Sequence, residues 1–140
     1  MVASIVKYID IKKNDCVLEI GPGKGALTKK MLEYEKELKI VGIEVDHELV
    51  DYLKNEISGK NFKIVPADVL KTDLEKILLN FFKNHQHWKI VGNLPYNISS
   101  PILFKLINLK YKVCKQILML QKEVVERMIA SPGNKTYGRL

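Results

Sequence analysis

The stretch VLEIGPGKGA, residues 17–26, joins a short apolar run to three closely spaced glycines and predicts a strand, a tight turn and the start of a helix. In an open α/β sheet, the turn after the first strand is where a nucleotide-like cofactor lies across the carboxyl ends of the strands. Gly21, Gly23 and Ala26 satisfy the dinucleotide pattern G-x-G-x-x-G/A, so a nicotinamide dinucleotide is one candidate ligand. The pattern alone does not identify the ligand.

Before and after this stretch, short apolar runs alternate with longer amphipathic segments along the whole chain. Strands are predicted at residues 16–20, 39–45, 62–66, 88–92 and 116–120. Helices are predicted up to about residue 11 and at residues 25–35, 47–57, 72–84, 100–108 and 122–130. Such alternation is typical of an α/β protein with an open, mostly parallel sheet, for which we expect the strand order 3-2-1-4-5. Asp46 is expected to cap the helix that follows it and is also a possible ligand.

Composition and charge narrow the class of protein. The 140 residues have room for one domain, and their formal net charge of +7, with a local concentration of lysines at 105, 110, 112 and 115, is compatible with a nucleic-acid partner. Lysine-rich surfaces also occur for solubility alone. No apolar run approaches the roughly 20 residues of a membrane-spanning helix, and no secretory signal is visible, so we expect a cytoplasmic protein without a membrane partner.

The cysteines and histidines show no metal-ligand spacing. Cys16 and Cys114 each lie in an apolar run, and neither has a second cysteine or a histidine at the spacing of a metal site, so both are expected to be buried free thiols. His85 and His87 flank Gln86 in a polar stretch and are expected in a solvent loop. We therefore predict no metal site.

One acidic residue stands at the end of the second predicted strand, and another follows the third. Glu44 is placed where a carboxylate accepts hydrogen bonds from the two hydroxyls of a ribose, which both NAD and S-adenosylmethionine carry. Asp68 follows the third strand and can accept a hydrogen bond from an adenine amine. Either residue alone is as well explained as a surface carboxylate or a cap. Their joint placement after neighbouring strands, with the glycine turn, favours a cofactor site.

The segment Asn93-Leu94-Pro95-Tyr96 follows the fourth predicted strand and supplies an amide oxygen, a backbone carbonyl, a rigid turn and an aromatic ring. The Asn93 side chain and the Leu94 carbonyl could hold the hydrogens of an aromatic amine, while Pro95 restricts the backbone and Tyr96 stacks on the base. A plain helix-capping turn would explain Asn93 or Pro95 but not all four residues. The segment therefore predicts a catalytic site for a planar amine such as adenine.

Six segments in this order resemble successive motifs of the ribosomal RNA adenine dimethyltransferase family of the kasugamycin-resistance type: residues 19–25, 43–46, 67–68, 93–101, 121–125 and 137–140. The resemblance implies a Rossmann-like, class I S-adenosylmethionine-dependent methyltransferase that dimethylates the N6 amines of two adjacent adenines in small-subunit ribosomal RNA. It implies a cofactor site made of Glu19, Gly21, Gly23, Glu44, Asp68 and Asn93. Gly21 and Glu44 would contact the methionine and ribose parts, Asp68 the adenine, and Asn93 both cofactor and target. Leu94, where related enzymes have isoleucine, favours the small-subunit enzymes over the large-subunit antibiotic-resistance methylases.

The same resemblance implies that residues 1–140 are a single catalytic domain that lacks both flanks of such an enzyme. Family members usually begin with a basic stretch and a Gln-Asn-Phe-Leu-like segment. Beyond the position of Leu140 they continue with two more strands, a Pro-rich loop and a helical RNA-binding domain. We therefore expect a monomeric core truncated after the fifth strand of the sheet.

Three alternatives remain open at this stage. The chain could be a core that binds cofactor or RNA without turnover, a large-subunit ribosomal RNA adenine methylase, or a nicotinamide-dependent oxidoreductase that uses the same glycine turn. The oxidoreductase would leave Asn93 to Tyr96 unexplained.

Overall fold

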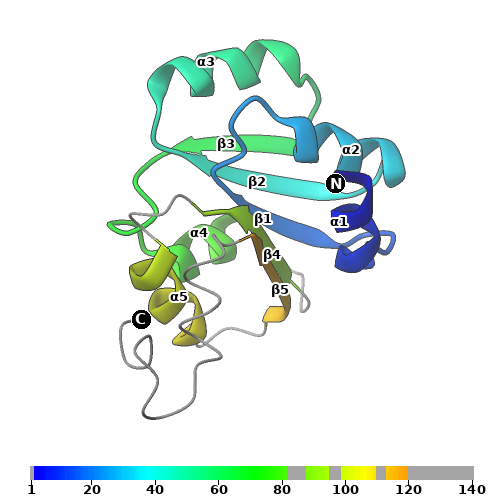
Figure 1. The fold of residues 1–140 in the computed structure, drawn as a ribbon. Helices are drawn as coiled ribbons and strands as arrows, with labels where there is room; N and C mark the ends of the chain where they lie inside the picture. Colours follow the sequence, from blue (N-terminus) through cyan, green and yellow to red (C-terminus); the bar gives the residue numbers. More distant parts are fainter. Residues whose placement is uncertain (1, 82–87, 95–98, 110–112, 120–140) are drawn as a thin grey trace.

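The computed structural model describes residues 2–81, 88–94, 99–109 and 113–119. Strands and helices alternate along the chain as α1 (Val2–Ile9), β1 (Cys16–Ile20), α2 (Ala26–Tyr34), β2 (Lys39–Glu44), α3 (His47–Glu56), β3 (Phe62–Pro66), α4 (Leu74–Phe81), β4 (Trp88–Asn93), α5 (Ser99–Ile107) and β5 (Val113–Met119). The strands form one parallel sheet in the order β3-β2-β1-β4-β5, with β3 and β5 at its edges (Figure 1). The predicted class and strand order are confirmed.

The register of the sheet brings the ends of four strands level with one another. Ile20 of β1 pairs with Ile43 of β2 on one side and with Gly92 of β4 on the other. Ile43 in turn pairs with Val65 of β3. Because the strands are parallel, the residues that follow these pairs all emerge at the carboxyl edge of the sheet.

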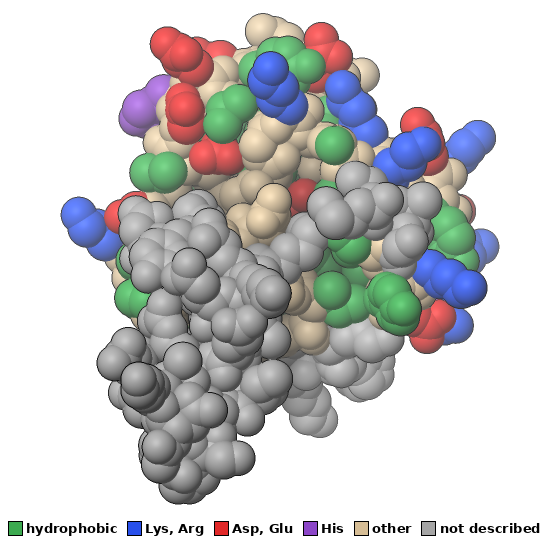
Figure 2. Space-filling model, in the orientation of Figure 1, with side chains coloured by type: hydrophobic (Ala, Val, Ile, Leu, Met, Phe, Trp, Pro, Cys, Tyr) green, Lys and Arg blue, Asp and Glu red, His purple; other side chains and the backbone are tan. Residues whose placement is uncertain are grey.

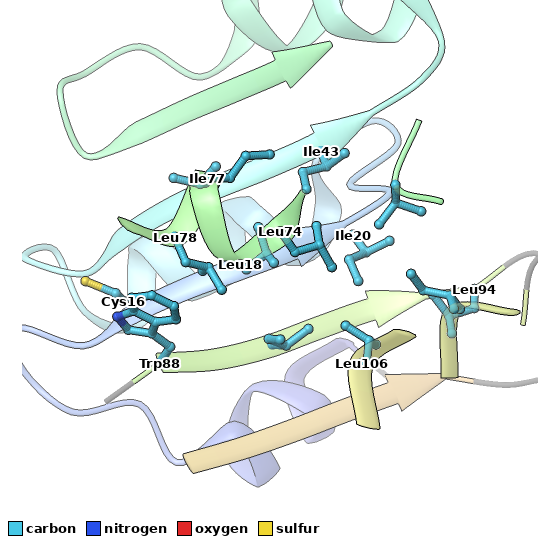
Figure 3. Close-up of a cluster of buried hydrophobic side chains, with 14 residues drawn as sticks. Cys16, Leu18, Ile20, Ile43, Leu74, Ile77, Leu78, Trp88, Leu94 and Leu106 are labelled. Atoms are coloured by element: carbon cyan, nitrogen blue, oxygen red, sulfur yellow. The ribbon is translucent and has the colours of Figure 1, made fainter. Parts of the chain in front are cut away.

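Helices cover both faces of the sheet, and alternate strand residues face opposite layers. On one face, Val17 and Val91 pack with residues of α1, α2 and α3, including Ile9, Met31 and Leu53. The opposite face packs against α4 and α5 through a larger cluster: Cys16, Leu18, Ile20, Val41, Ile43, Val69, Leu74, Ile77, Leu78, Trp88, Ile90, Leu94, Ile102 and Leu106. Figure 3 shows Leu74 and Leu78 of α4 close to Leu18 of β1 in this second cluster.

Two helix boundaries differ from the sequence prediction by two residues, for local reasons. The helix α1 ends at Ile9 rather than near residue 11, because Asp10 has a positive φ of 55°. The helix α4 begins at Leu74 rather than at residue 72. The Thr72 hydroxyl donates to the Asp68 carbonyl, and the Asp73 carboxylate accepts from the N–H of Lys76, so residues up to 73 form a turn and a cap.

Some strand boundaries also differ from the sequence prediction. The strand β5 begins at Val113, three residues before the predicted 116, and a register shift lies between Trp88 and Lys89 where it pairs with β4. A lysine at position 115 interrupts the apolar run and concealed this part of the strand. The strand β4 extends through Asn93, which pairs with Met119, and β2 ends at Glu44 instead of 45.

Several sequence predictions lie outside the described residues, among them the helix at 122–130, the carboxyl end of the predicted helix at 72–84, and His85 with His87. In the ranges that are described, no helix is long and apolar enough to cross a membrane. Cys16 is a buried free thiol, as expected, and burial raises its pKa to about 12.

Candidate functional site

The glycine turn lies between β1 and α2 at the carboxyl edge of the sheet. Gly21, Gly23 and Gly25 all have positive φ, and the N–H of Gly21 donates to the Ile43 carbonyl at 2.9 Å, which ties the turn to the end of β2. Glycine is needed most at Gly25, where φ is +84° and an added Cβ would lie 2.9 Å from Cδ1 of Ile57. An added Cβ at Gly23 would meet nothing within 4 Å, so the outer side of this turn is open to a ligand.

Glu44, at the end of β2, holds the glycine turn from the neighbouring strand. Its Oε1 accepts a hydrogen bond from the N–H of Gly23 at 3.1 Å, and its Oε2 accepts from the N–H groups of Val45 and Asp46 at 3.0 and 3.2 Å. The residue is only 7% exposed. These three donors use three of the roughly four lone-pair positions of a carboxylate. A ribose at Glu44 would therefore share the carboxylate with the backbone.

Asp46 caps α3, as the sequence predicted. Its Oδ1 accepts hydrogen bonds from the N–H groups of Glu48 and Leu49 at 2.9 and 3.4 Å. The cap fixes the start of α3 directly beside the Glu44 carboxylate.

Glu19 lies one residue before the end of β1 and is buried beneath the glycine turn. It is 2% exposed, and its Oε1 accepts a hydrogen bond from the hydroxyl of the buried Thr28 in α2. Burial raises the Glu19 pKa to about 7, while the Thr28 hydrogen bond acts in the opposite direction. In this structure Glu19 therefore supports the packing of α2 on β1, a role that the sequence reading did not include.

Asp68 begins the turn between β3 and α4. Its Oδ1 accepts from the N–H of Leu70 at 3.0 Å, and its backbone carbonyl accepts from the N–H of Lys71 and the hydroxyl of Thr72 at 3.0 and 2.6 Å. The preceding residue, Ala67, donates its N–H to the Glu44 carbonyl at 3.0 Å. The Asp68 turn is thereby joined to the end of β2.

Asn93 and Leu94 end the fourth strand beside the glycine turn. A Cβ added at Gly21 would lie 3.8 Å from the backbone oxygen of Asn93, so the two strand ends are close neighbours. The Asn93 side chain is exposed, whereas Leu94 is 2% exposed and packs into the core cluster (Figure 3). Pro95 and Tyr96 lie outside the described residues.

The order of the strands thus places four predicted residues in one row along the carboxyl edge: Asp68, Glu44, Gly21 and Asn93. Hydrogen bonds link the first three strand ends, and backbone proximity links Gly21 to Asn93. Donors and acceptors of this kind along the switch point of a parallel sheet suit a nucleoside-containing ligand.

Two lysines have contacts that the sequence did not suggest. Lys105 belongs to the lysine-rich stretch of the sequence, but its side chain donates to the backbone carbonyls of Val69 and Thr72. Lys89, inside an apparently apolar strand, is buried and pairs with Asp15 at 2.7 Å near the amino end of the sheet. The sequence feature that could have revealed these contacts is a lysine at a position of a helix or strand that faces the core.

Charges are mixed on the face of the molecule shown in Figure 2. Acidic side chains gather over α3 with a histidine, and lysine side chains lie among them and elsewhere on this face. The acidic group comprises the exposed residues Asp46, Glu48, Asp51 and Glu56. In the part of the chain that the structure describes, no group of three or more His, Cys, Asp or Glu side chains could hold a metal ion.

The parallel sheet, the glycine turn and the polar strand ends define a Rossmann-like methyltransferase fold. Within that class, a family model described as ribosomal RNA adenine dimethylase matches residues 1–140, and the chain belongs to this family.

Individual proteins agree with this assignment. The ribosomal RNA small subunit methyltransferase A of Janthinobacterium sp. (strain Marseille) is 44% identical over 98% of the chain. A dimethyladenosine transferase from Plasmodium falciparum is 33% identical over 99% of the chain, and the two structures superpose with a TM-score of 0.75. The 23S rRNA methyltransferase ErmE shares the fold, with 24% identity, 90% coverage and a TM-score of 0.69. The chain spans 52% of the Janthinobacterium protein and 46% and 47% of the two solved chains, about half of each.

Proposed function

We propose that this chain forms the cofactor-binding and adenine-binding core of an S-adenosylmethionine-dependent methyltransferase that dimethylates N6 of adenines in small-subunit ribosomal RNA. The observation that carries the proposal is the row of Asp68, Glu44, Gly21 and Asn93 along one edge of the sheet, in a chain that belongs to the adenine dimethylase family. Relatives named for the small ribosomal subunit favour that RNA over the large-subunit RNA.

The residues at this edge fit S-adenosylmethionine. The open outer side of Gly23 lets a ligand approach the backbone, and the Glu44 carboxylate is an acceptor for ribose hydroxyls. Asp68 is half-buried and is an acceptor for the adenine amine. When bound, the cofactor supplies a methyl group on a positively charged sulfur. Glu19 would support this site by holding α2 on β1 through Thr28.

The work of the protein in the reaction is to position the target. The exposed amide of Asn93 and the Leu94 carbonyl accept hydrogen bonds from the two hydrogens of the adenine amine, and the buried Leu94 side chain anchors that carbonyl. Held in this way, the nitrogen lone pair is directed out of the ring plane and toward the methyl donor. Pro95 and Tyr96 are proposed to stiffen the turn and stack on the base. Positioning of this kind can supply most of the rate acceleration of a two-substrate transfer.

The target adenine has to leave its RNA stack to reach this edge of the sheet. The RNA substrate, the monomeric state and the absence of a membrane partner remain predictions from the sequence. Incubation of the chain with tritiated S-adenosylmethionine and unmethylated small ribosomal subunits, followed by nucleoside analysis, tests both the substrate and the number of methyl groups added.

A cofactor titration separates the proposal from its alternatives. Calorimetry should show binding of S-adenosylmethionine and no binding of NADH at the same concentrations. Preferential binding of NADH would replace the proposal by an oxidoreductase. Binding of S-adenosylmethionine without methyl transfer to small or large subunits would identify a core that binds cofactor without turnover.

A further inference from the structure

Lys105 connects the helix after the Asn93 segment to the turn that carries Asp68. It lies in α5, and its Nζ donates to the Val69 carbonyl at 2.7 Å and to the Thr72 carbonyl. Both carbonyls belong to the turn between β3 and α4. An ammonium group has three donors, so two of the three are used on this turn.

The turn is organised by its own hydrogen bonds, and it is also attached on the side of α5. Its internal hydrogen bonds, from Leu70, Lys71 and Thr72 to Asp68, fix Asp68 relative to its own turn. They do not determine where the turn lies relative to β4 and α5. Val69 packs in the same core cluster as Ile102 and Leu106 of α5, and the two bonds from Lys105, which span more than thirty positions of sequence, add a directional link to the backbone of the turn.

The electrostatic surroundings of Lys105 indicate that its charge serves to hold the protein backbone. Burial lowers the pKa of Lys105, while the nearby carboxylates of Asp73 and Asp68 act in the opposite direction. A partly buried ammonium bonded to two carbonyls is costly to desolvate, and its charge-assisted bonds offset that cost only in this geometry. Lys105 is therefore engaged with the protein backbone and is poorly placed to bind an RNA phosphate.

We propose that Lys105 is a positioning residue that holds the β3–α4 turn against α5 and so keeps Asp68 in line with Asn93. This inference rests on the proposed function, because Asp68 matters as the adenine acceptor of the cofactor site. Lys105 would act through Asp68 and would not itself touch the cofactor.

Calorimetric titration of S-adenosylmethionine into four forms of the chain tests this role: the unaltered protein, Lys105→Met, Asp68→Asn and the double variant. Lys105→Met should weaken binding about tenfold, since two charge-assisted bonds are lost. Because Lys105 acts through Asp68, the double variant should bind within about twofold of Asp68→Asn alone. Additive losses would show that Lys105 acts independently of Asp68 and would overturn the proposal.

Two further variants complete the test. Lys105→Arg keeps a positive charge and N–H donors and should bind S-adenosylmethionine more tightly than Lys105→Met does. Lys76→Met removes an exposed lysine of the adjacent helix α4 and should leave binding unchanged.

The remaining outcomes are also decisive. If Lys105→Met binds as tightly as the unaltered chain, or unfolds outright as judged by circular dichroism, Lys105 is not a positioning residue for Asp68. If the unaltered chain itself binds no S-adenosylmethionine, the proposed function fails, and this inference fails with it.

Discussion

The carboxylate of Glu44 accepts a hydrogen bond from the backbone N–H of Gly23 at 3.1 Å, so the end of β2 holds the turn that follows β1. The same carboxylate accepts from the first two N–H groups after β2. One side chain thus organises the turn, the start of α3 and the proposed ribose contact.

Glu44→Gln should weaken S-adenosylmethionine binding by about tenfold or more and lower the free energy of unfolding by roughly 1–3 kcal/mol. The amide nitrogen of glutamine cannot accept a hydrogen bond, so it must oppose at least one of the three N–H donors. Calorimetry and urea denaturation measure the two effects. Glu48→Gln, on the exposed face of α3, is the matched control and should change neither; equal behaviour of the two variants would contradict the role of Glu44.

Glu19 should make stability depend on pH. Its folded-state pKa of about 7 lies above the ordinary value of 4.5, so its favourable contribution is complete below about pH 4.5 and is lost as pH rises through 7. The loss is on the order of 3 kcal/mol at most. Glu19→Gln keeps an acceptor for Thr28 and removes the titration. Urea denaturation from pH 4.5 to 8.5 should therefore show a flatter stability profile for the variant. Parallel profiles would mean that Glu19 does not titrate in this range.

Asn93→Ala should reduce methyl transfer to small ribosomal subunits by about a hundredfold or more, because the target amine loses one of its two acceptors. The free energy of unfolding should change by less than about 0.5 kcal/mol, since the side chain is exposed at the end of β4. Asn80→Ala, an exposed asparagine of α4, controls for a general effect. Normal transfer by the Asn93 variant would remove Asn93 from the mechanism.

Lys89→Ala should destabilise the domain by roughly 3 kcal/mol, because the nearly buried Asp15 carboxylate loses its charged partner and keeps only the N–H of Lys12 as a donor. Lys30→Ala breaks an exposed pair with Glu33 and should cost less than about 1 kcal/mol. Urea denaturation compares the two variants. Lys89 lies near the opposite edge of the sheet from the proposed site, so its folded variant should keep normal cofactor affinity. A large loss of affinity would indicate that this pair supports the site as well.

The fold was largely predictable because its signals are local or periodic. Buried parallel strands show as short apolar runs, and alternation with helices sets the strand order by the usual rules of chain connection. The ends of helices and strands were less predictable where a polar side chain forms a turn or a cap, or interrupts an apolar run. Thr72 and Asp73 read as the start of a helix but form a turn and a cap, and Lys115 hid the first part of β5.

The site was predictable as a set of residues but not as a network. Gly21, Glu44, Asp68 and Asn93 were identified because each lies at or just after the end of a strand, and parallel strands must end at one edge. Nothing in the sequence indicated that Glu44 would bind Gly23, that Glu19 would be buried against Thr28, or that Lys105 would hold the Asp68 turn.

The amino-acid sequence by itself determined the backbone features that depend on a few adjacent residues, such as the positive φ of the glycine turn and the Asp46 cap on α3. Only the tertiary structure decided which of the many similar charged side chains are buried and hold a neighbouring turn or helix in place. A lysine has the same chemistry at positions 76 and 105. What differs is the packing of α5 beside the β3–α4 turn, which brings two backbone carbonyls to Lys105 while Lys76 stays exposed.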